Sequence, residues 1–432
     1  MRWLIMAVPA AIYFVSYFHR VAPAVVAADL MRAFAVTAAA VGTLASIYPY
    51  VFAVMALVAG SLVDTLGPRR TLALGGATMG AGAVVFGLAP VFSVAMAGRL
   101  AVGLGASVVL IAFLALAAEW FRPDEFATVS GLSQTVGNLG GLVAASPLAV
   151  LVEAIGWRQS FVAIGAVTGL LGLLALFAVR DRPETLGLPR VAPGGSRALG
   201  LRGVLRGIPA VVSNPRTWPP IVAAGGVYAT LISFLGLWGV PYLVQVYGLS
   251  RLRAATLVSA IAVGVVAGSP LTGWISDRRL GARRLPFVVS ATLYAACWLP
   301  LVIPAWRPPV ELLAPFFFLM GLTSCGLVLV WSCVREVNDP ARVGIVVGFC
   351  NVPIFLLFAV LQWLTGVILD AGWTGSVVDG MRLYPVSAWT AAFGTCLAIA
   401  VVAVGAATRI TETYCRNIWQ SRAQSSLSSI AT

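Results

Sequence analysis

Long apolar runs, separated by short polar loops, are the feature of this sequence that leaves it the fewest possible folds. Only 10% of its 432 residues are charged and 60% are hydrophobic, so the charged residues are too few to cover a surface in water. About twelve runs reach the roughly 20 residues that a helix needs to cross a lipid bilayer. The sequence therefore predicts an all-α membrane protein of about twelve transmembrane helices, surrounded by the lipid bilayer. The runs cover residues 3–29, 38–63, 71–91, 94–119, 127–152, 158–179, 218–245, 252–275, 285–304, 310–334, 342–369 and 385–408.

Arginine supplies all 28 basic residues, and most of them lie in alternate loops. Loops rich in positive charge usually face the cytoplasm. The pattern therefore predicts a multi-pass protein of the cytoplasmic (inner) membrane with both termini in the cytoplasm, and it does not suggest nucleic acid as a partner. The first run could be taken for a signal peptide, but it continues past a typical signal core, so we expect a membrane helix. The arginine-rich loops contain Arg69, Arg70, Arg122, residues 180–216, residues 278–284, residues 335–342 and the tail.

Two segments recur at similar spacing in the two halves of the chain. GSLVDTLGPRR at residues 60–70 returns as GWISDRRLGARR at 273–284, and VLVEAIGW at 150–157 returns as VILDAGW at 367–373. A duplicated bundle of helices explains both repeats. We expect a first bundle in residues 1–182, a cytoplasmic linker in 183–216, a second bundle in 217–410 and a cytoplasmic tail in 411–432. The linker segment LGLRGVLRGI is open to two interpretations, an amphipathic helix on the membrane surface or a flexible connection.

These motifs resemble those of the major facilitator superfamily. The loop at residues 60–70 has the family's order of Gly, Leu, Asp, Gly and two basic residues, and GRLAVGLGAS at 98–107 resembles its fourth-helix motif. The resemblance implies two pseudo-symmetric six-helix bundles that rock about a central site and function as a monomer. It implies a structural or relay role for Arg99. It also implies a conformational gate that contains Gly60, Asp64, Gly67, Arg69, Arg70, Arg122, Asp277, Arg283 and Arg284.

The same pattern predicts the contacts of this gate. Asp64 should lie near Arg342, at the start of the eleventh helix, with Arg122 as a second partner. By pseudo-symmetry, Asp277 should face the start of the fifth helix around Phe126. A carboxylate at a helix N-terminus is stabilised by about 0.3–1 kcal/mol, so these contacts should hold the cytoplasmic ends of the two bundles together.

Three other segments resemble the organophosphate antiporters and anion symporters of that superfamily. They are YFHRVAPAVVAADL at 17–30, SQTVGNLGGLVAASP at 133–147 and RDRPETLGLP at 180–189. In those families an arginine at the position of Arg20 binds an anionic substrate, so the resemblance implies this role for Arg20. The seventh run lacks the second arginine of glycerol-3-phosphate carriers, and His19 stands where anion symporters often have an acidic residue.

Arg20 lies inside the first run, where an arginine costs about 2.5–3.5 kcal/mol on insertion scales. Tyr13 and Tyr17, seven and three residues earlier, share its face of the helix. Pro23 has no N–H, so the carbonyl of His19 loses its helical partner and the helix should kink. We predict that Arg20 binds an anionic group and that His19, which can titrate near neutral pH, carries a coupled proton. The alternatives are a structural salt bridge for Arg20 and a packing hydrogen bond for His19.

Polar and aromatic side chains in other runs are further candidates for contacts with the substrate. Several of them lie one helical turn apart, so they share a face of their helix. The alternative for each is a hydrogen bond between helices. These candidates are Gln134, Asn138, Tyr228, Trp238, Tyr242 and Asn351.

Catalytic and metal-binding patterns are not found in the runs. They contain no paired carboxylates and no cluster of metal ligands, and the six cysteines form no CxxC pair. We therefore expect no enzymatic activity, cofactor or metal. The sequence predicts a secondary active transporter that moves a small organic anion by alternating access, with the proton as coupling ion. Two alternatives stay open: an exporter of hydrophobic or cationic compounds, and a transporter-like membrane receptor for an extracellular anion.

Overall fold

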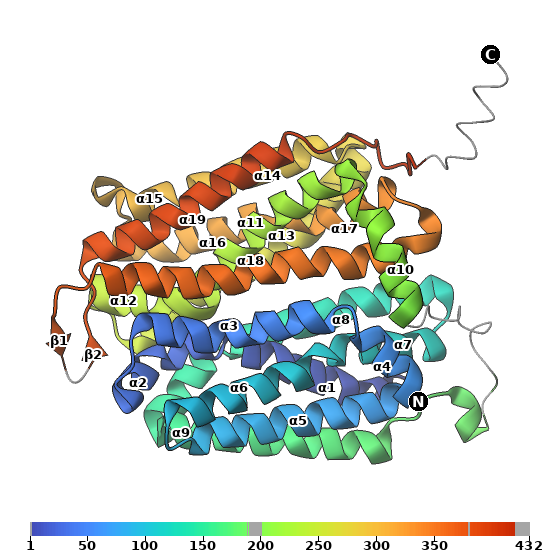
Figure 1. Cartoon of the computed structure of the whole chain (residues 1–432), viewed down its shortest axis with the longest axis horizontal. Coiled ribbons are helices and arrows are strands. Elements are labelled where there is room, and N and C mark those ends of the chain that lie inside the picture. Colours follow the sequence, from blue (N-terminus) through green and yellow to red (C-terminus); the bar gives the residue numbers. More distant parts are fainter. Residues whose placement is uncertain (1, 188, 190–200, 379–380, 420–432) are drawn as a thin grey trace.

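The computed structural model describes residues 2–187, 189, 201–378 and 381–419, and nearly all of them lie in helices (Figure 1). The predicted all-α architecture is confirmed. The N-terminal helices lie on one side of the molecule and the C-terminal helices on the other (Figure 1). The first side contains α1 (Arg2–Val21), α2 (Pro23–Phe34), α3 (Ala38–Met55), α4 (Ala59–Leu66), α5 (Pro68–Leu88), α6 (Phe92–Ser107), α7 (Val109–Trp120), α8 (Pro123–Val143) and α9 (Ser146–Ala178).

The second side begins after the linker and ends before the C-terminal tail. Its longer elements are α11 (Trp218–Ser233), α12 (Gly239–Tyr247), α13 (Arg251–Trp274), α14 (Arg284–Ala296), α16 (Leu313–Thr323), α18 (Val343–Ala371) and α19 (Val386–Ala407). Its shorter elements are α15 (Leu299–Val302), α17 (Val330–Glu336), β1 (Val377–Val378), β2 (Met381–Arg382), the π-helices η3 (Phe234–Trp238) and η4 (Ile275–Leu280), and the 3₁₀ helices η5 (Pro304–Trp306), η6 (Val310–Leu312), η7 (Ser324–Leu329) and η8 (Pro340–Arg342). The linker contains α10 (Leu201–Val212) and the 3₁₀ helices η1 (Pro183–Leu186) and η2 (Pro215–Thr217).

The number of membrane crossings follows from one unusually long span. Among the described residues, eleven helical spans are long and apolar enough to cross a membrane. One of them, Thr135–Ala178, has 44 residues, about twice what a single crossing needs. Gly156 lies within it with φ 80° and ψ 158°, a conformation that breaks the helix and that glycine adopts without strain. This span therefore provides two crossings, which accounts for the number predicted from the sequence.

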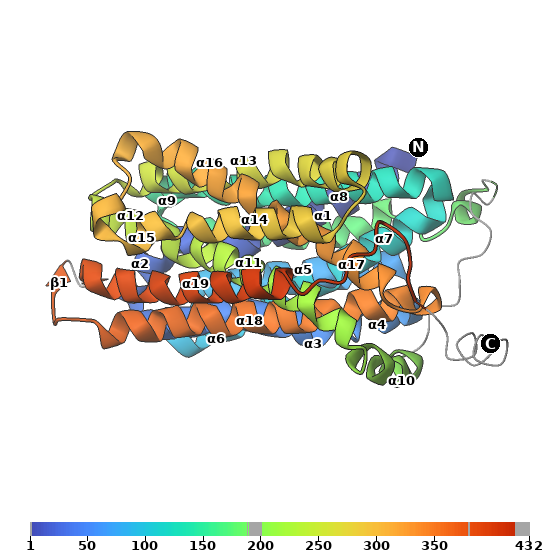
Figure 2. The same ribbon diagram turned by 90° about the horizontal axis from the view of Figure 1, so that it is seen from above.

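Part of the linker is helical. Residues 201–212 form α10, which lies at one end of the molecule beside the start of α18 (Figures 1 and 2). A Cβ atom on Gly207 would come within 2.3 Å of Ile345 Cδ1, so the two helices are in close contact. Residues 201–208 of the segment are therefore helical, residues 199–200 lie outside the described part, and a position on the membrane surface stays a prediction. The predicted bundle boundaries near residues 182, 217 and 410 stay predictions.

Glycines let the helices of the first side approach closely. A Cβ atom on Gly80 of α5 would lie 2.4 Å from the backbone nitrogen of Gly169 on α9. One on Gly105 of α6 would lie 2.3 Å from the carbonyl oxygen of Gly75 on α5. Small residues at such crossings allow tight packing between membrane helices, where the hydrophobic effect does not drive association. The GRLAVGLGAS motif is therefore part of a helix-packing surface.

The two ends of the molecule differ in how the two sides meet. We call the end that carries β1 and β2 the hairpin end, and the opposite end, with Arg2 and α10, the linker end (Figures 1 and 2). Toward the hairpin end, α3 and α18 are packed without space for side chains between them. A Cβ atom on Gly42 would lie 2.6 Å from the carbonyl oxygen of Gln362, and one on Gly366 would lie 2.5 Å from that of Ala38.

A carboxylate fastens the hairpin end. Asp370, at the end of α18, accepts hydrogen bonds from the N–H groups of Ala38 (3.1 Å) and Ala39 (2.7 Å) at the N-terminus of α3. The Tyr384 hydroxyl donates to the same carboxylate at 2.8 Å. Hydrogen bonds to a charged acceptor at a helix N-terminus are stronger than neutral ones. We call this contact the Asp370 latch; it joins the two sides together with the ion pair of Arg251 and Asp29 at 2.8 Å.

The linker end lacks the contacts that were predicted for the gate. Asp64 is exposed and has no hydrogen bond or ion pair among the described residues. Arg342 pairs instead with Asp339 at 3.4 Å, and Asp277 pairs with Arg283 on its own side of the molecule. The side chain of Phe126 lies outside the described part. The predicted contacts of Asp64 and Asp277 are therefore absent from this conformation, which is fastened at the other end.

The Asp370 latch predicts a conformational shift. Asp370→Asn removes the charge at the α3 N-terminus, which is worth about 1 kcal/mol, so the conformation open at the hairpin end should gain roughly fivefold in population. The measurement is thiol labelling of Ser46→Cys, in a background without other reactive cysteines, because Ser46 is only 1% exposed and bonds to the Ala359 carbonyl across the boundary.

Glu153→Gln is the matched control for this shift. Glu153 occupies the position of Asp370 in the first copy of the repeat, but its side chain is exposed. The Glu153→Gln variant should therefore have the same labelling rate as the wild type. Equal labelling of the Asp370→Asn variant and the wild type would show that the latch does not hold the hairpin end closed.

Candidate functional site

A break in the first membrane helix creates the candidate site. α1 ends at Val21 and α2 begins at Pro23, which confirms the interruption predicted from the proline. The carbonyl of His19, which has lost its helical partner, accepts a hydrogen bond from Arg99 Nη1 at 2.6 Å. A charged donor thus replaces the missing backbone N–H. This hydrogen bond connects Arg99 to the interrupted helix, and the structural or relay role that the motif implied stays a prediction.

Arg20 lies one residue after the carbonyl that Arg99 holds, and it points to the boundary between the two sides. Only 9% of it is exposed. Its Nη1 donates to the hydroxyl of Tyr228 on α11 at 3.1 Å. Its guanidinium carbon lies 4.2 to 5.7 Å from the ring centroids of four aromatic residues, close enough for cation–π attraction. These are Tyr17 (4.2 Å), Phe52 (5.2 Å), Tyr48 (5.6 Å) and Phe355 (5.7 Å).

We call Tyr17, Tyr48, Phe52, Tyr228 and Phe355 the aromatic cage, and both sides of the molecule contribute to it. Tyr17 belongs to α1, and Tyr48 and Phe52 belong to α3. On the second side, Tyr228 belongs to α11 and Phe355 belongs to α18. The rings of Phe52 and Phe355 stack across the boundary with centroids 5.3 Å apart. A movement of one side relative to the other would therefore change the surroundings of Arg20.

The charge of Arg20 has no carboxylate partner in the part of the chain that the structure describes. The ion pairs there involve other residues, and Arg20 Nε is buried without a hydrogen-bond partner. Cation–π contacts contribute only about 0.5–2 kcal/mol, whereas an ion buried without a counterion costs several kcal/mol. The arrangement is therefore suited to an external anion, which would supply the missing negative charge.

Other predicted residues lie near the cage. Tyr13 is 2% exposed and packs edge-on against Tyr17 with ring centroids 5.1 Å apart. A Cβ atom on Gly137 of α8 would lie 3.0 Å from both tyrosine rings, and Asn138, the next residue along this helix, is half-buried. Asn351 lies one turn before Phe355 on α18, and its amide donates to the Val347 carbonyl at 3.1 Å. The side chain of Gln134 lies outside the described part of the chain.

Two predicted residues are placed away from Arg20. Trp238 and Tyr242 both pack on Trp389 of α19, with ring centroids 6.2 and 5.6 Å apart, inside the second side. Their place in the cage is taken by residues that the sequence analysis did not select, Tyr48, Phe52 and Phe355. Helical spacing could have identified them. Tyr48 and Phe52 lie four residues apart on one run, and Phe355 lies four residues after Asn351, so each pair shares a face of its helix.

His19 faces the interior of the first side and not the boundary. It is completely buried, and its Nε2 lies 3.4 Å from the hydroxyl of Thr168 on α9. Beside it is a cavity of about 10 Å³, which Arg99 and Phe161 help to line. That volume is enough for about one water molecule. This conformation therefore keeps His19 apart from Arg20, although the two residues are adjacent in the sequence.

The repeated loop motifs have equivalent acidic caps. On the first side, Gly67 has φ 81°, and the backbone N–H of Arg69 donates to Asp181 at 2.7 Å at the start of α5. On the second side, Glu412 accepts from the N–H groups of Arg283 (2.8 Å) and Arg284 (2.9 Å) at the start of α14. Although burial alone would raise the pKa of Glu412, these hydrogen bonds lower it overall.

The remaining gate residues have separate surroundings. Arg283 binds Glu336 through Nη2 at 2.9 Å and also contacts Asp277. The backbone N–H of Arg122, at the start of α8, donates to Glu125 at 3.1 Å. Arg70 is exposed, and a Cβ atom on Gly60 would have no atom within 4 Å. In this conformation the motif residues therefore organise each side by itself.

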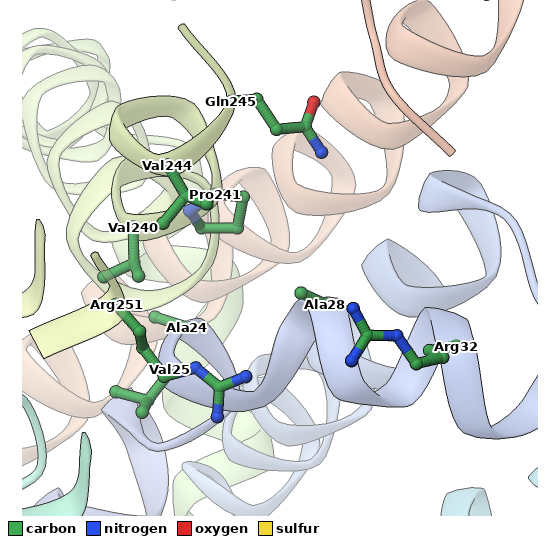
Figure 3. Close-up of a pocket in the computed structure, with 9 residues that line it drawn as sticks. All are labelled: Ala24, Val25, Ala28, Arg32, Val240, Pro241, Val244, Gln245 and Arg251. Atoms are coloured by element: carbon green, nitrogen blue, oxygen red, sulfur yellow. The ribbon is translucent and has the colours of Figure 1, made fainter. Parts of the chain in front are cut away.

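A second cavity lies at the hairpin end between α2 and α12 (Figure 3). Its volume is about 140 Å³. Most of its lining is apolar, but Arg32 and Gln245 project at its edge, and the guanidinium of Arg251 lies over α2 near Val25 (Figure 3). Arg251 is held there by its ion pair with Asp29 at 2.8 Å, and Gln245 is bonded to the backbone of Tyr384. This cavity therefore lies at the end of the molecule that the Asp370 latch closes.

The chain is similar to several bacterial membrane proteins. It is 24% identical over 381 residues to "Membrane sensor protein UhpC" of Salmonella typhimurium, which covers 84% of each chain. It is 25% identical to "Probable sulfoacetate transporter SauU" of Cupriavidus necator, over 66% of this chain and 67% of that one. It is 22% identical to "Probable hexose phosphate transport protein" of Chlamydia trachomatis, over 61% of this chain and 62% of that one.

The fold is also that of solved transporters. A bacterial homolog of the human lysosomal transporter Spinster matches with a TM-score of 0.75 and 18% identity, over 97% of this chain and 98% of that one. The nucleoside transporter NupG matches with a TM-score of 0.72 and 12% identity, over 93% of this chain and 98% of that one. The family model of the Major Facilitator Superfamily matches residues 10–352 and 229–422. The chain belongs to the Major Facilitator Superfamily.

Proposed function

We propose that this protein is a secondary active transporter that moves a small organic anion across the cytoplasmic membrane by alternating access. The observation that carries the proposal is the buried Arg20, which has no carboxylate partner among the described residues and lies between both sides. An intramembrane cation of this kind normally marks a transport pathway. The names of two relatives, a sulfoacetate and a hexose phosphate transporter, refer to small anions and support the same substrate class.

The two ends of the molecule supply the alternation. If the linker end faces the cytoplasm, as the distribution of arginines predicts, the Asp370 latch closes the extracellular side in this conformation. An anion that binds Arg20 would compete for the donor that now reaches Tyr228 and would alter the contact between the two sides. The contacts of Asp64 would form when the latch opens. Each conformation would thus be held by a carboxylate at a different end.

Proton coupling is the finer part of the proposal. His19 is the only histidine of the chain, and it is linked to Arg20 through the peptide that Arg99 fixes. The cavity beside its ring has space for about one water molecule, through which a proton could reach it. We infer that protonation of His19 would alter the hold of Arg99 on the broken helix and thereby the position of Arg20.

A receptor for an extracellular anion is the second candidate function. The similarity over 84% of the chain to a membrane sensor protein favours it. The same Arg20 site would serve a receptor, so binding alone does not separate the two functions. Flux into proteoliposomes does, because a receptor binds the anion without moving it. An exporter of cationic compounds is not favoured, because the cage surrounds a cation and contains no carboxylate.

Replacement of Arg20 tests the anion site. Arg20→Lys keeps the charge but loses the planar fork that can bind a carboxylate in two places, so anion binding should weaken at least tenfold and uptake should stop. Isothermal titration and proteoliposome uptake measure the two effects. Arg158→Lys is the matched control, since Arg158 also packs on aromatic rings, Phe34 and Trp157, but donates to the Ala89 carbonyl. Undiminished uptake by Arg20→Ala would refute the site.

Replacement of His19 tests proton coupling. His19→Gln can keep a hydrogen bond to Thr168 but cannot carry a proton at this position, so accumulation driven by a pH gradient should be lost. Counterflow exchange of substrate should remain, because it needs no net proton movement. Both are measured in the same proteoliposomes. Accumulation equal to that of the wild type would assign the proton to another residue or exclude proton coupling.

Replacement of Asp64 tests the opposite gate. Asp64→Asn should destabilise the conformation closed at the linker end, which is the reverse of the shift expected for Asp370→Asn. Thiol labelling of Gly348→Cys on α18, which lies opposite the Ala56 carbonyl, should therefore rise, and turnover should fall more than affinity. Unchanged labelling together with a loss of affinity would place Asp64 in the binding site.

A further inference from the structure

We propose that the ligand of the Arg20 site carries a single negative charge on a flat, apolar body, which is the chemical class of aromatic carboxylates and sulfonates. The inference rests on the proposed function, because it assumes that Arg20 binds an anion. It goes further in two respects: it excludes sugar phosphates as the preferred class, and it assigns the aromatic cage to the body of the ligand.

The first observation is the number of positive charges that a ligand can reach. Arg99 also lies over the ring of Tyr48, at 4.9 Å, but it is only 4% exposed and its Nη1 is occupied by the His19 carbonyl. Arg251 is neutralised by Asp29, and the cavity that it lines is at the hairpin end. Among the described residues, Arg20 is therefore the one cation that lies over cage rings from both sides of the molecule, whereas Arg99 lies over Tyr48 alone. A phosphate monoester, with nearly two charges at neutral pH, would bring a charge without a partner.

The second observation is that four of the aromatic residues of the cage are more exposed than Arg20 itself. Arg20 is buried, whereas the rings of Tyr17, Phe52, Tyr228 and Phe355 are each partly exposed. A ligand that reaches the guanidinium would therefore contact aromatic rings. Aromatic rings in this position favour other flat apolar groups by stacked or edge-on packing. The stacked pair of Phe52 and Phe355 offers such a surface on both sides of the molecule.

The third observation is the small number of hydrogen-bonding groups for a sugar. The Tyr48 hydroxyl donates to the Ser16 carbonyl at 3.2 Å, and the amide of Asn351 donates to the Val347 carbonyl. The Tyr228 hydroxyl accepts from Arg20 and keeps its own O–H to donate, which would serve one hydroxyl group of a sugar. A polyol that enters this site would leave several of its hydroxyl groups without partners, which costs free energy for each group. An apolar body has no such requirement.

The experiment compares ligands that differ in one property at a time. Purified full-length protein in lipid nanodiscs is titrated by calorimetry with benzoate and benzenesulfonate, with gluconate (the same charge on a polyol), with phenyl phosphate at pH 8 (the same ring with two charges) and with glucose 6-phosphate. We expect benzoate or benzenesulfonate to bind at least tenfold more tightly than the other three. Binding of both should weaken at least tenfold in Arg20→Lys.

Variants of the cage test how much the apolar body of the ligand contributes to binding, apart from its charge. Phe355→Leu and Phe52→Leu should each weaken benzoate binding about three- to tenfold, while any binding of gluconate stays the same. Phe318→Leu, at an exposed position on α16, is the control and should change neither. The melting temperature without ligand identifies a variant that has lost its fold, and two cage variants are used so that one can replace the other.

The outcomes distinguish the inference from the function on which it rests. Arg20-dependent binding that is tighter for phenyl phosphate, glucose 6-phosphate or gluconate would overturn the single-charge, apolar class and leave the anion site intact. Equal loss of gluconate and benzoate affinity in the Phe variants would overturn the role of the cage. If no anion binds in an Arg20-dependent way, the inference and the proposed function both fail.

Discussion

A buried guanidinium that has no carboxylate partner among the described residues is the constraint on which the arrangement of this protein depends. Arg20 is 9% exposed, its guanidinium contacts aromatic rings and donates to the Tyr228 hydroxyl, and its Nε has no hydrogen-bond partner in the part of the chain that the structure describes. Such a group is costly in a membrane unless something recovers the free energy. The helix break at Pro23, the Arg99 bond to the His19 carbonyl and the aromatic cage all serve to hold this one charge at the boundary between the two sides.

The same boundary explains how the site and the conformational change are connected. Four helices, α1, α3, α11 and α18, contribute to the cage, and α3 and α18 also form the Asp370 latch. A carboxylate at a helix N-terminus is strong enough to bias an equilibrium but weak enough to be released. Because the Asp370 latch and the aromatic cage share α3 and α18, a ligand bound at Arg20 can affect the latch directly through these two helices. The acidic caps Asp181 and Glu412, in contrast, stabilise each side separately.

The sequence predicted the helices, the broken first helix and the unusual position of Arg20, because these depend on local chemistry: apolar length, a missing N–H and a charge among apolar residues. Tyr17 and Tyr228, which meet Arg20, were among the predicted residues, but Tyr48, Phe52 and Phe355 were not. Spacing places Trp238 and Tyr242 on one face of a helix, but which face turns to the boundary depends on packing against Trp389. The Asp370 latch was also missed, although its segment was noted as a repeat, because the contact joins residues about 330 positions apart.

The most direct test of the central claim is a crystal structure with para-bromobenzoate, in which anomalous scattering locates the bromine. The account predicts that the carboxylate contacts the Arg20 guanidinium and that the bromine lies among the rings of Phe52, Tyr228 and Phe355. A bromine in the hairpin-end cavity beside Arg32 and Arg251, with Arg20 still bonded to Tyr228 alone, would contradict it.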